Sequence, residues 1–62
     1  MSMKLDKAIM VAKKTAKARN DEIYVVIDHD GYEISTAYEL DTFFAGAPVI
    51  FEVYADGSVL GH

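Results

Sequence analysis

Two Asp-Gly pairs, at positions 30–31 and 56–57, each lie between short runs rich in β-branched and aromatic residues. Asp-Gly favours a two-residue turn whose central residues both take positive φ, so each pair predicts a β-hairpin. The first flanking run, at 22–28, alternates apolar and polar residues as half-buried strands do. The sequence therefore predicts two hairpins, one around 30–31 and one within 49–62.

A two-residue loop fixes the strand register, and the register fixes which side chains share a face. We expect Asp28 opposite Glu33 in the first hairpin and Tyr54 opposite Val59 in the second. Like charges directly opposite on neighbouring strands destabilise a sheet, so the first pair would suit a cationic partner. The predicted core face of the first hairpin carries Ile23, Val25, Ile27 and Ile34.

Residues 3–19 are predicted to form a helix, with Ser2 as its N-cap and Asn20 in the left-handed position at its end. Small and apolar residues recur there at helical spacing and form a stripe that would cover the core face. A second, short helix is expected at about 38–45. Thr36 and Glu39 have the spacing of a capping box, and Gly46 provides a stop. The stripe consists of Leu5, Ala8, Ile9, Ala12 and Ala16.

The predicted order of elements is α-β-β-α-β-β, in one domain over residues 1–62. We expect an α+β fold: a small, mostly antiparallel sheet of about four strands with the long helix packed on one face and the short helix between the hairpins. The chain has no cysteine, so disulfides cannot stabilise it. Small domains often depend on oligomerisation instead, and we expect self-association.

Charge is divided along the chain. All six basic residues lie within 4–19, whereas nine of the ten acidic residues lie at or after position 21. No apolar run approaches the ~20 residues of a membrane span, and lysines interrupt the N-terminal segment where a signal peptide needs an apolar stretch. We therefore expect a soluble, cytoplasmic protein.

Potential ligands gather at the first predicted turn, where Asp28, His29, Asp30 and Glu33 lie within six residues. A calcium loop of the EF-hand type spreads its ligands over about 12 residues between two helices. This segment is much shorter and lies between strands, and a hairpin tip explains Asp30 and Gly31 fully. We expect no metal site, no cofactor and no catalytic residue.

The second sheet face is the preferred binding surface because no predicted helix covers it. Exposed apolar and tyrosine side chains together indicate a protein interface. Asp28, Glu33 and Asp56 would form an acidic rim. The sequence thus predicts a non-enzymatic interaction protein that binds itself or another protein through Tyr24, Val26, Ile50, Tyr54 and Val59.

Other functions stay open at this point. Lys13, Lys14 and Lys17 on the first helix could neutralise phosphates, which makes a nucleic-acid-binding module the main alternative. The acidic residues after position 21 could instead occupy a basic groove, as nucleic-acid mimics do. A helix lying over the second sheet face would remove the protein interface, and a minimal enzyme is a further alternative.

The run GYEISTAYELDTFFAGAPVIFEVYADG, at 31–57, resembles small uncharacterised bacteriophage-encoded accessory proteins. In these a strand is followed by a short acidic helix, a Phe-Phe-Ala-Gly stop and another strand. The stop here is Phe43, Phe44, Ala45 and Gly46. The resemblance implies an accessory protein that binds a host or phage component in the host cytoplasm, and it assigns no functional residue.

Overall fold

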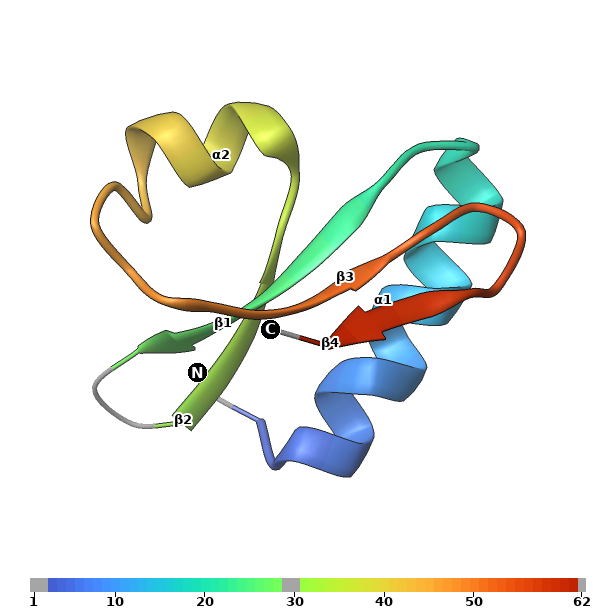
Figure 1. Cartoon of the computed structure of the whole chain (residues 1–62), viewed down its shortest axis with the longest axis horizontal. Coiled ribbons are helices and arrows are strands. Elements are labelled where there is room, and N and C mark those ends of the chain that lie inside the picture. Colours follow the sequence, from blue (N-terminus) through green and yellow to red (C-terminus); the bar gives the residue numbers. More distant parts are fainter. Residues whose placement is uncertain (1–2, 29–30, 62) are drawn as a thin grey trace.

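A computed structural model describes residues 3–28 and 31–61 of the chain. Within these residues, none of the helices has the length and apolar character needed to span a bilayer. The elements in chain order (Figure 1) are α1 (Leu5–Arg19), β1 (Ile23–Asp28), β2 (Gly31–Ser35), α2 (Ala37–Thr42), β3 (Val49–Val53) and β4 (Val59–Gly61).

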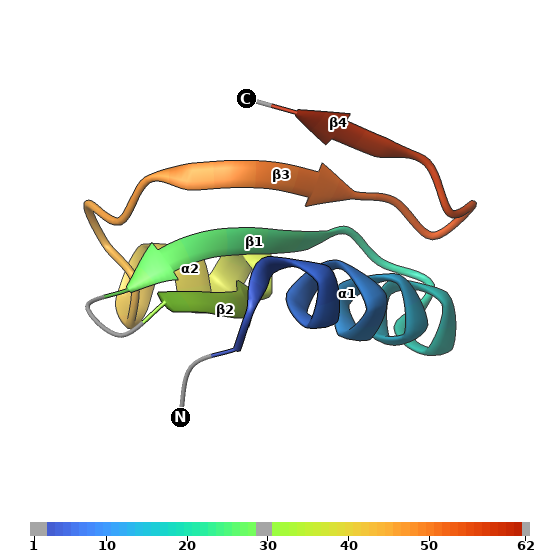
Figure 2. The same ribbon diagram turned by 90° about the horizontal axis from the view of Figure 1, so that it is seen from below.

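The strands form one antiparallel sheet with the order β2-β1-β3-β4. The two helices lie on opposite sides of this sheet, α1 in front of it and α2 behind it in Figure 2. Both helices contact the β1–β2 half, and α1 also reaches β3. The structure confirms the predicted α+β class and the predicted order of elements.

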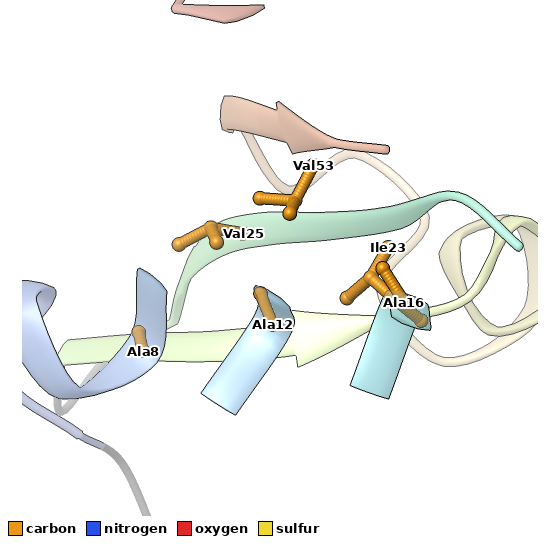
Figure 3. Packing of buried hydrophobic residues seen from close by; sticks show 6 residues of the cluster. All are labelled: Ala8, Ala12, Ala16, Ile23, Val25 and Val53. Atoms are coloured by element: carbon orange, nitrogen blue, oxygen red, sulfur yellow. The ribbon is translucent and has the colours of Figure 1, made fainter. Parts of the chain in front are cut away.

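The core depends on the close approach of α1 to the sheet. Three alanines one turn apart, Ala8, Ala12 and Ala16, are fully buried. Alanine has almost no side chain beyond its backbone, so the helix axis can lie near the strands it covers. As Figure 3 shows, these alanines face the sheet residues of the same core cluster, which are Ile23, Val25 and Val53.

The chain before α1 differs from the prediction. Lys4 has an extended backbone, with φ −71° and ψ 156°, so the helix begins at Leu5 rather than at residue 3. Met3 instead pairs with Tyr32 of β2: the Met3 N–H donates to the Tyr32 carbonyl at 2.8 Å, and the Tyr32 N–H donates to the Met3 carbonyl at 3.0 Å. The predicted N-cap, Ser2, lies outside the described residues. The end of α1 is as predicted, because Asn20 is left-handed with φ 53°.

The first hairpin is present, but its predicted register is wrong. Asp28 pairs with Gly31 and Val26 pairs with Glu33, so Asp28 and Glu33 do not face each other. Residues 29–30 lie outside the described part of the chain, and Gly31 belongs to β2. The register is shifted by two residues. Because side chains alternate with a period of two, each residue of the hairpin stays on its predicted face of the sheet, and Val25 and Ile34 still share the α1 side.

The predicted register of the second hairpin is wrong by one residue, and this smaller shift has a larger consequence. Its loop has three residues rather than two. The Gly57 N–H donates to the Tyr54 carbonyl at 2.9 Å, and the Tyr54 N–H donates to the Ser58 carbonyl at 2.9 Å. Gly57 has φ +93°, as the glycine of such a bulged turn requires. Val59 therefore pairs with Val53 instead of Tyr54, and it changes face.

Helix α2 begins with the predicted capping box. The Glu39 N–H donates to the Thr36 hydroxyl at 3.1 Å, and the Thr36 N–H donates to the Glu39 carboxylate at 3.1 Å. The helix ends at Thr42, earlier than the predicted residue 45. It contacts β1 and β2 on the side opposite α1, where Val26 is fully buried. Part of the second sheet face is therefore covered.

The alanine stripe yields a stability prediction. Replacing Ala12 by leucine forces α1 away from the sheet, so Ala12→Leu should lower the free energy of unfolding by about 1–3 kcal/mol. The matched control is Met10→Leu on the same helix, where the side chain is 52% exposed and the change should stay within ~0.5 kcal/mol. Urea unfolding followed by circular dichroism measures both. Equal midpoints for the two variants would contradict the close packing of α1.

Candidate protein-binding surface

On the α2 side of the sheet, the β3–β4 half is uncovered in the described chain, whereas α1 contacts β3 on the other side. Within the described chain, neither helix contacts β4. Two apolar side chains on this strand are exposed, Val59 at 38% and Leu60 at 50%. They project to opposite faces, Val59 toward the α1 side and Leu60 toward the α2 side, because Val59 pairs with the core residue Val53.

Two tyrosine–glutamate pairs lie on the α2 side of the sheet, one at the start of β1 and the other at the end of β3. The Tyr24 hydroxyl donates to the Glu22 carboxylate at 2.8 Å, and the Tyr54 hydroxyl donates to the Glu52 carboxylate at 3.3 Å. Tyr24 is directly opposite Glu52 across β1 and β3, which brings the pairs together. Leu60 is opposite Glu52 on β4 and extends the row. We call Glu22, Tyr24, Glu52, Tyr54 and Leu60 the tyrosine–glutamate surface.

The surroundings of both phenols raise their pKa. The hydrogen bond to Glu22 is the main cause that raises the pKa of Tyr24 from 10.0 to about 12, and burial and the negative charges of Glu22 and Glu52 add to it. The pKa of Tyr54 is also raised, first by partial desolvation and then by the same two carboxylates. Each phenol is thereby a donor to a carboxylate, so the rings are held in place and present their apolar faces.

Asp56 lies at the tip of the β3–β4 turn and is exposed. Its carboxylate accepts from the Ser58 hydroxyl at 2.6 Å and from the Ser58 N–H at 2.9 Å. These hydrogen bonds lower the pKa of Asp56 below its ordinary value. The group therefore adds a fixed negative charge at one end of the surface.

The structure brings together only some of the residues predicted to form the interface. Tyr24 and Tyr54 lie on one surface, as expected. Val26 is wrong as a contact residue because it is fully buried on the side that α2 covers. Val59 is wrong because the three-residue turn places it on the opposite face. Ile50 is half-buried and is the extra residue of an irregularity between β1 and β3, where Val26 pairs with Val49 and Val25 with Phe51.

The predicted acidic rim is only partly assembled. Glu33 is half-buried on β2 opposite Val26, on the part of the sheet that α2 contacts. The side chain of Asp28 is outside what the structure describes, as are His29 and Asp30. Asp56 is at the end of the uncovered half. The negative charges beside the tyrosines come from Glu22 and Glu52 instead.

Sequence reasoning missed the glutamates and Leu60. The signal for the glutamates is the repeated Glu-x-Tyr spacing at 22–24 and 52–54, since residues two apart on a strand share a face. Leu60 was missed because the predicted register of the second hairpin placed Val59 on this face in its place. Two further exposed aromatic residues lie on or next to α2: Tyr38 at 73% exposure and Phe43 at 74%.

The lysines of the alternative hypothesis lie on α1, so the sheet separates them from the tyrosine–glutamate surface (Figure 2). Lys13, Lys14 and Lys17 are all exposed. Because the chain has no lysine or arginine after Arg19, every strand and α2 lack basic side chains. The molecule therefore has a basic helical side and an acidic side.

In the described part of the chain, no cavity is found and no three acidic or histidine side chains gather as a metal site would require. Comparison of the sequence with protein-family models and with curated proteins, and of the chain with solved structures, finds no match. The surface itself is therefore the basis for a functional proposal.

The Tyr24–Glu22 hydrogen bond yields a pH prediction. A phenol whose pKa is higher in the folded protein than in the unfolded chain stabilises the fold below pH 10, and this contribution is lost as the pH rises from 10.0 to about 12. Phenolate absorbance should show Tyr24 ionising late, and Glu22→Gln should move its pKa back toward 10.0. The Tyr24→Phe variant lacks this phenol, so its difference from the wild type identifies the part of the absorbance that comes from Tyr24. An unchanged titration in Glu22→Gln would show that the hydrogen bond does not set the pKa.

Proposed function

We propose that this protein acts by binding another protein through the tyrosine–glutamate surface, and that it acts without catalysis. The observation that carries the proposal is the pairing of Tyr24 and Tyr54 with glutamates on the α2 side of β1 and β3, next to the exposed Leu60. Tyrosines with a fixed hydroxyl offer a large apolar contact area at a low entropic cost, which is why they are enriched in interfaces.

The charge of the surface indicates the chemistry of the partner. Glu22, Glu52 and Asp56 supply negative charge, and no lysine or arginine follows Arg19 to offset it. A partner with lysines or arginines around an apolar centre would complement this pattern. Such complementarity speeds association and selects against acidic partners. The surface thus fits a basic protein surface.

The alternative is nucleic-acid binding by Lys13, Lys14 and Lys17. It is favoured by one observation, their shared exposure on a helix that the sheet separates from the acidic surface. This alternative predicts that duplex DNA or RNA retains the protein at low salt and releases it steeply as salt rises.

The test is affinity capture with three forms of the immobilised protein: the wild type, a surface variant with Tyr54→Ser and Leu60→Ser, and a helix variant with Lys13→Gln and Lys17→Gln. The proposal predicts a specific protein that the wild type and the helix variant retain and the surface variant loses. Circular dichroism establishes that the surface variant is folded, and direct titration of the identified protein gives the affinities.

Two results would contradict the proposal. One is a partner that the surface variant retains as well as the wild type does. The other is retention of nucleic acid alone, lost in the helix variant, which would transfer the function to α1.

A further inference from the structure

The two edges of the sheet differ in how their backbone groups are satisfied. At the β2 edge, both the N–H and the carbonyl of Tyr32 bond to Met3, so the chain's own N-terminal segment covers this edge. At the β4 edge, the described residues contain no further strand, because the sheet order ends at β4. An edge strand with unpaired backbone groups is a template for an additional strand.

The hairpin geometry shows which groups of β4 face outward. In an antiparallel pair, residues alternate between those that bond to the neighbouring strand and those that point away from it. The Tyr54 N–H donates to the Ser58 carbonyl, so the backbone groups of Ser58 point toward β3. The N–H and carbonyl of Leu60, two residues further along, point the same way. The N–H and carbonyl groups of Val59 and Gly61 therefore point away from the sheet.

This edge lacks most of the features that protect natural edge strands. Charged side chains and proline commonly block such edges. The described residues of β4 are Val59, Leu60 and Gly61, which include neither, and all three are exposed. Among charged side chains, proline and short length, the described residues of this edge show only the short length of the strand. A partner strand would meet outward hydrogen-bonding groups flanked by Leu60 on one face and Val59 on the other.

We infer that β4 accepts an extended, basic segment of a partner protein as a fifth strand. This inference rests on the proposed function and specifies how the partner binds. The added strand would extend the row of side chains that contains Leu60 and Glu52. The backbone of Glu52 would lie two strand spacings, about 10 Å, from the backbone of the added strand, and a lysine side chain on that strand would shorten the distance between the two charges. Negative charge on this side complements lysine or arginine on the added strand.

A second copy of this chain fits the edge less well. Its β4 would bring another set of acidic residues and no lysine or arginine, because all six basic residues precede β1. Charge complementarity therefore favours a basic segment from another protein over a second copy.

The probe is an acetylated and amidated heptapeptide of alternating valine and lysine, with the corresponding valine–glutamate peptide as its control. Binding is measured by titration into the full chain made by chemical synthesis. One form carries a methyl group on the Gly61 nitrogen, which removes the outward N–H and places a methyl group in the path of the added strand. Its matched control is Gly61→Ala, an isomer that keeps the N–H and whose Cβ meets only the Phe51 ring, at 3.4 Å.

We expect the lysine peptide to bind, with an affinity that falls as salt rises. Methylation of the Gly61 nitrogen should weaken binding at least about tenfold, whereas Gly61→Ala should stay within about twofold of the wild type. Equal binding by the methylated and alanine forms would overturn the inference. If Tyr54→Ser with Leu60→Ser still abolished binding in that case, the proposed function would stand and only the strand addition would fail.

Other outcomes also decide the matter. Absence of lysine-peptide binding, or equal binding of the glutamate peptide, overturns the assignment of a basic segment, while affinity capture tests the proposed function separately. A dimer in light scattering that methylation of Gly61 dissociates would show that the occupant is a second copy, which also overturns the inference.

Discussion

The close packing of three alanines on the sheet is the interaction on which the rest of this structure depends. Ala8, Ala12 and Ala16 let α1 lie directly on Ile23, Val25 and Val53, all of them nearly or fully buried. Larger residues in the stripe would cost stability, as overpacking does in dense cores. A chain of 62 residues without cysteine has little else to stabilise it, so this contact must be efficient.

The position of α1 determines which surfaces remain for binding. Since α1 lies mainly over β1 and β2 and reaches β3, and α2 contacts β1 and β2 from the other side, β3 is left uncovered on the α2 side and β4 lies beyond both helices. Tyr24 and Tyr54 lie half-buried on the α2 side, where hydrogen bonds to Glu22 and Glu52 hold them. The open edge of β4 borders the same surface. A partner that used both would contact side chains and backbone at once, which combines specificity with affinity.

The sequence was sufficient for the elements and most of the core, but not for the strand registers. Ile27, expected on the core face, is 41% exposed. The helical stripe, the capping box at Thr36 and the order of elements followed from spacing alone. Asp-Gly can occupy either a two-residue or a bulged three-residue turn, and local sequence does not distinguish them. The one-residue shift at Asp56-Gly57 exchanged Val59 for Leu60 on the candidate surface. The burial of Val26 depended on where α2 lies, which is a tertiary contact that no local pattern encodes.

Amide hydrogen exchange, measured residue by residue by NMR in dilute solution, tests the central claim most directly. The account predicts that the amide of Leu60, which faces β3, is protected, while the neighbouring amides of Val59 and Gly61 exchange nearly as fast as in an unfolded chain. Tyr32, on the opposite edge, should be protected by its bond to Met3. Equal protection of Val59, Leu60 and Gly61 would contradict the account, because it would mean that β4 is already paired on its outer side.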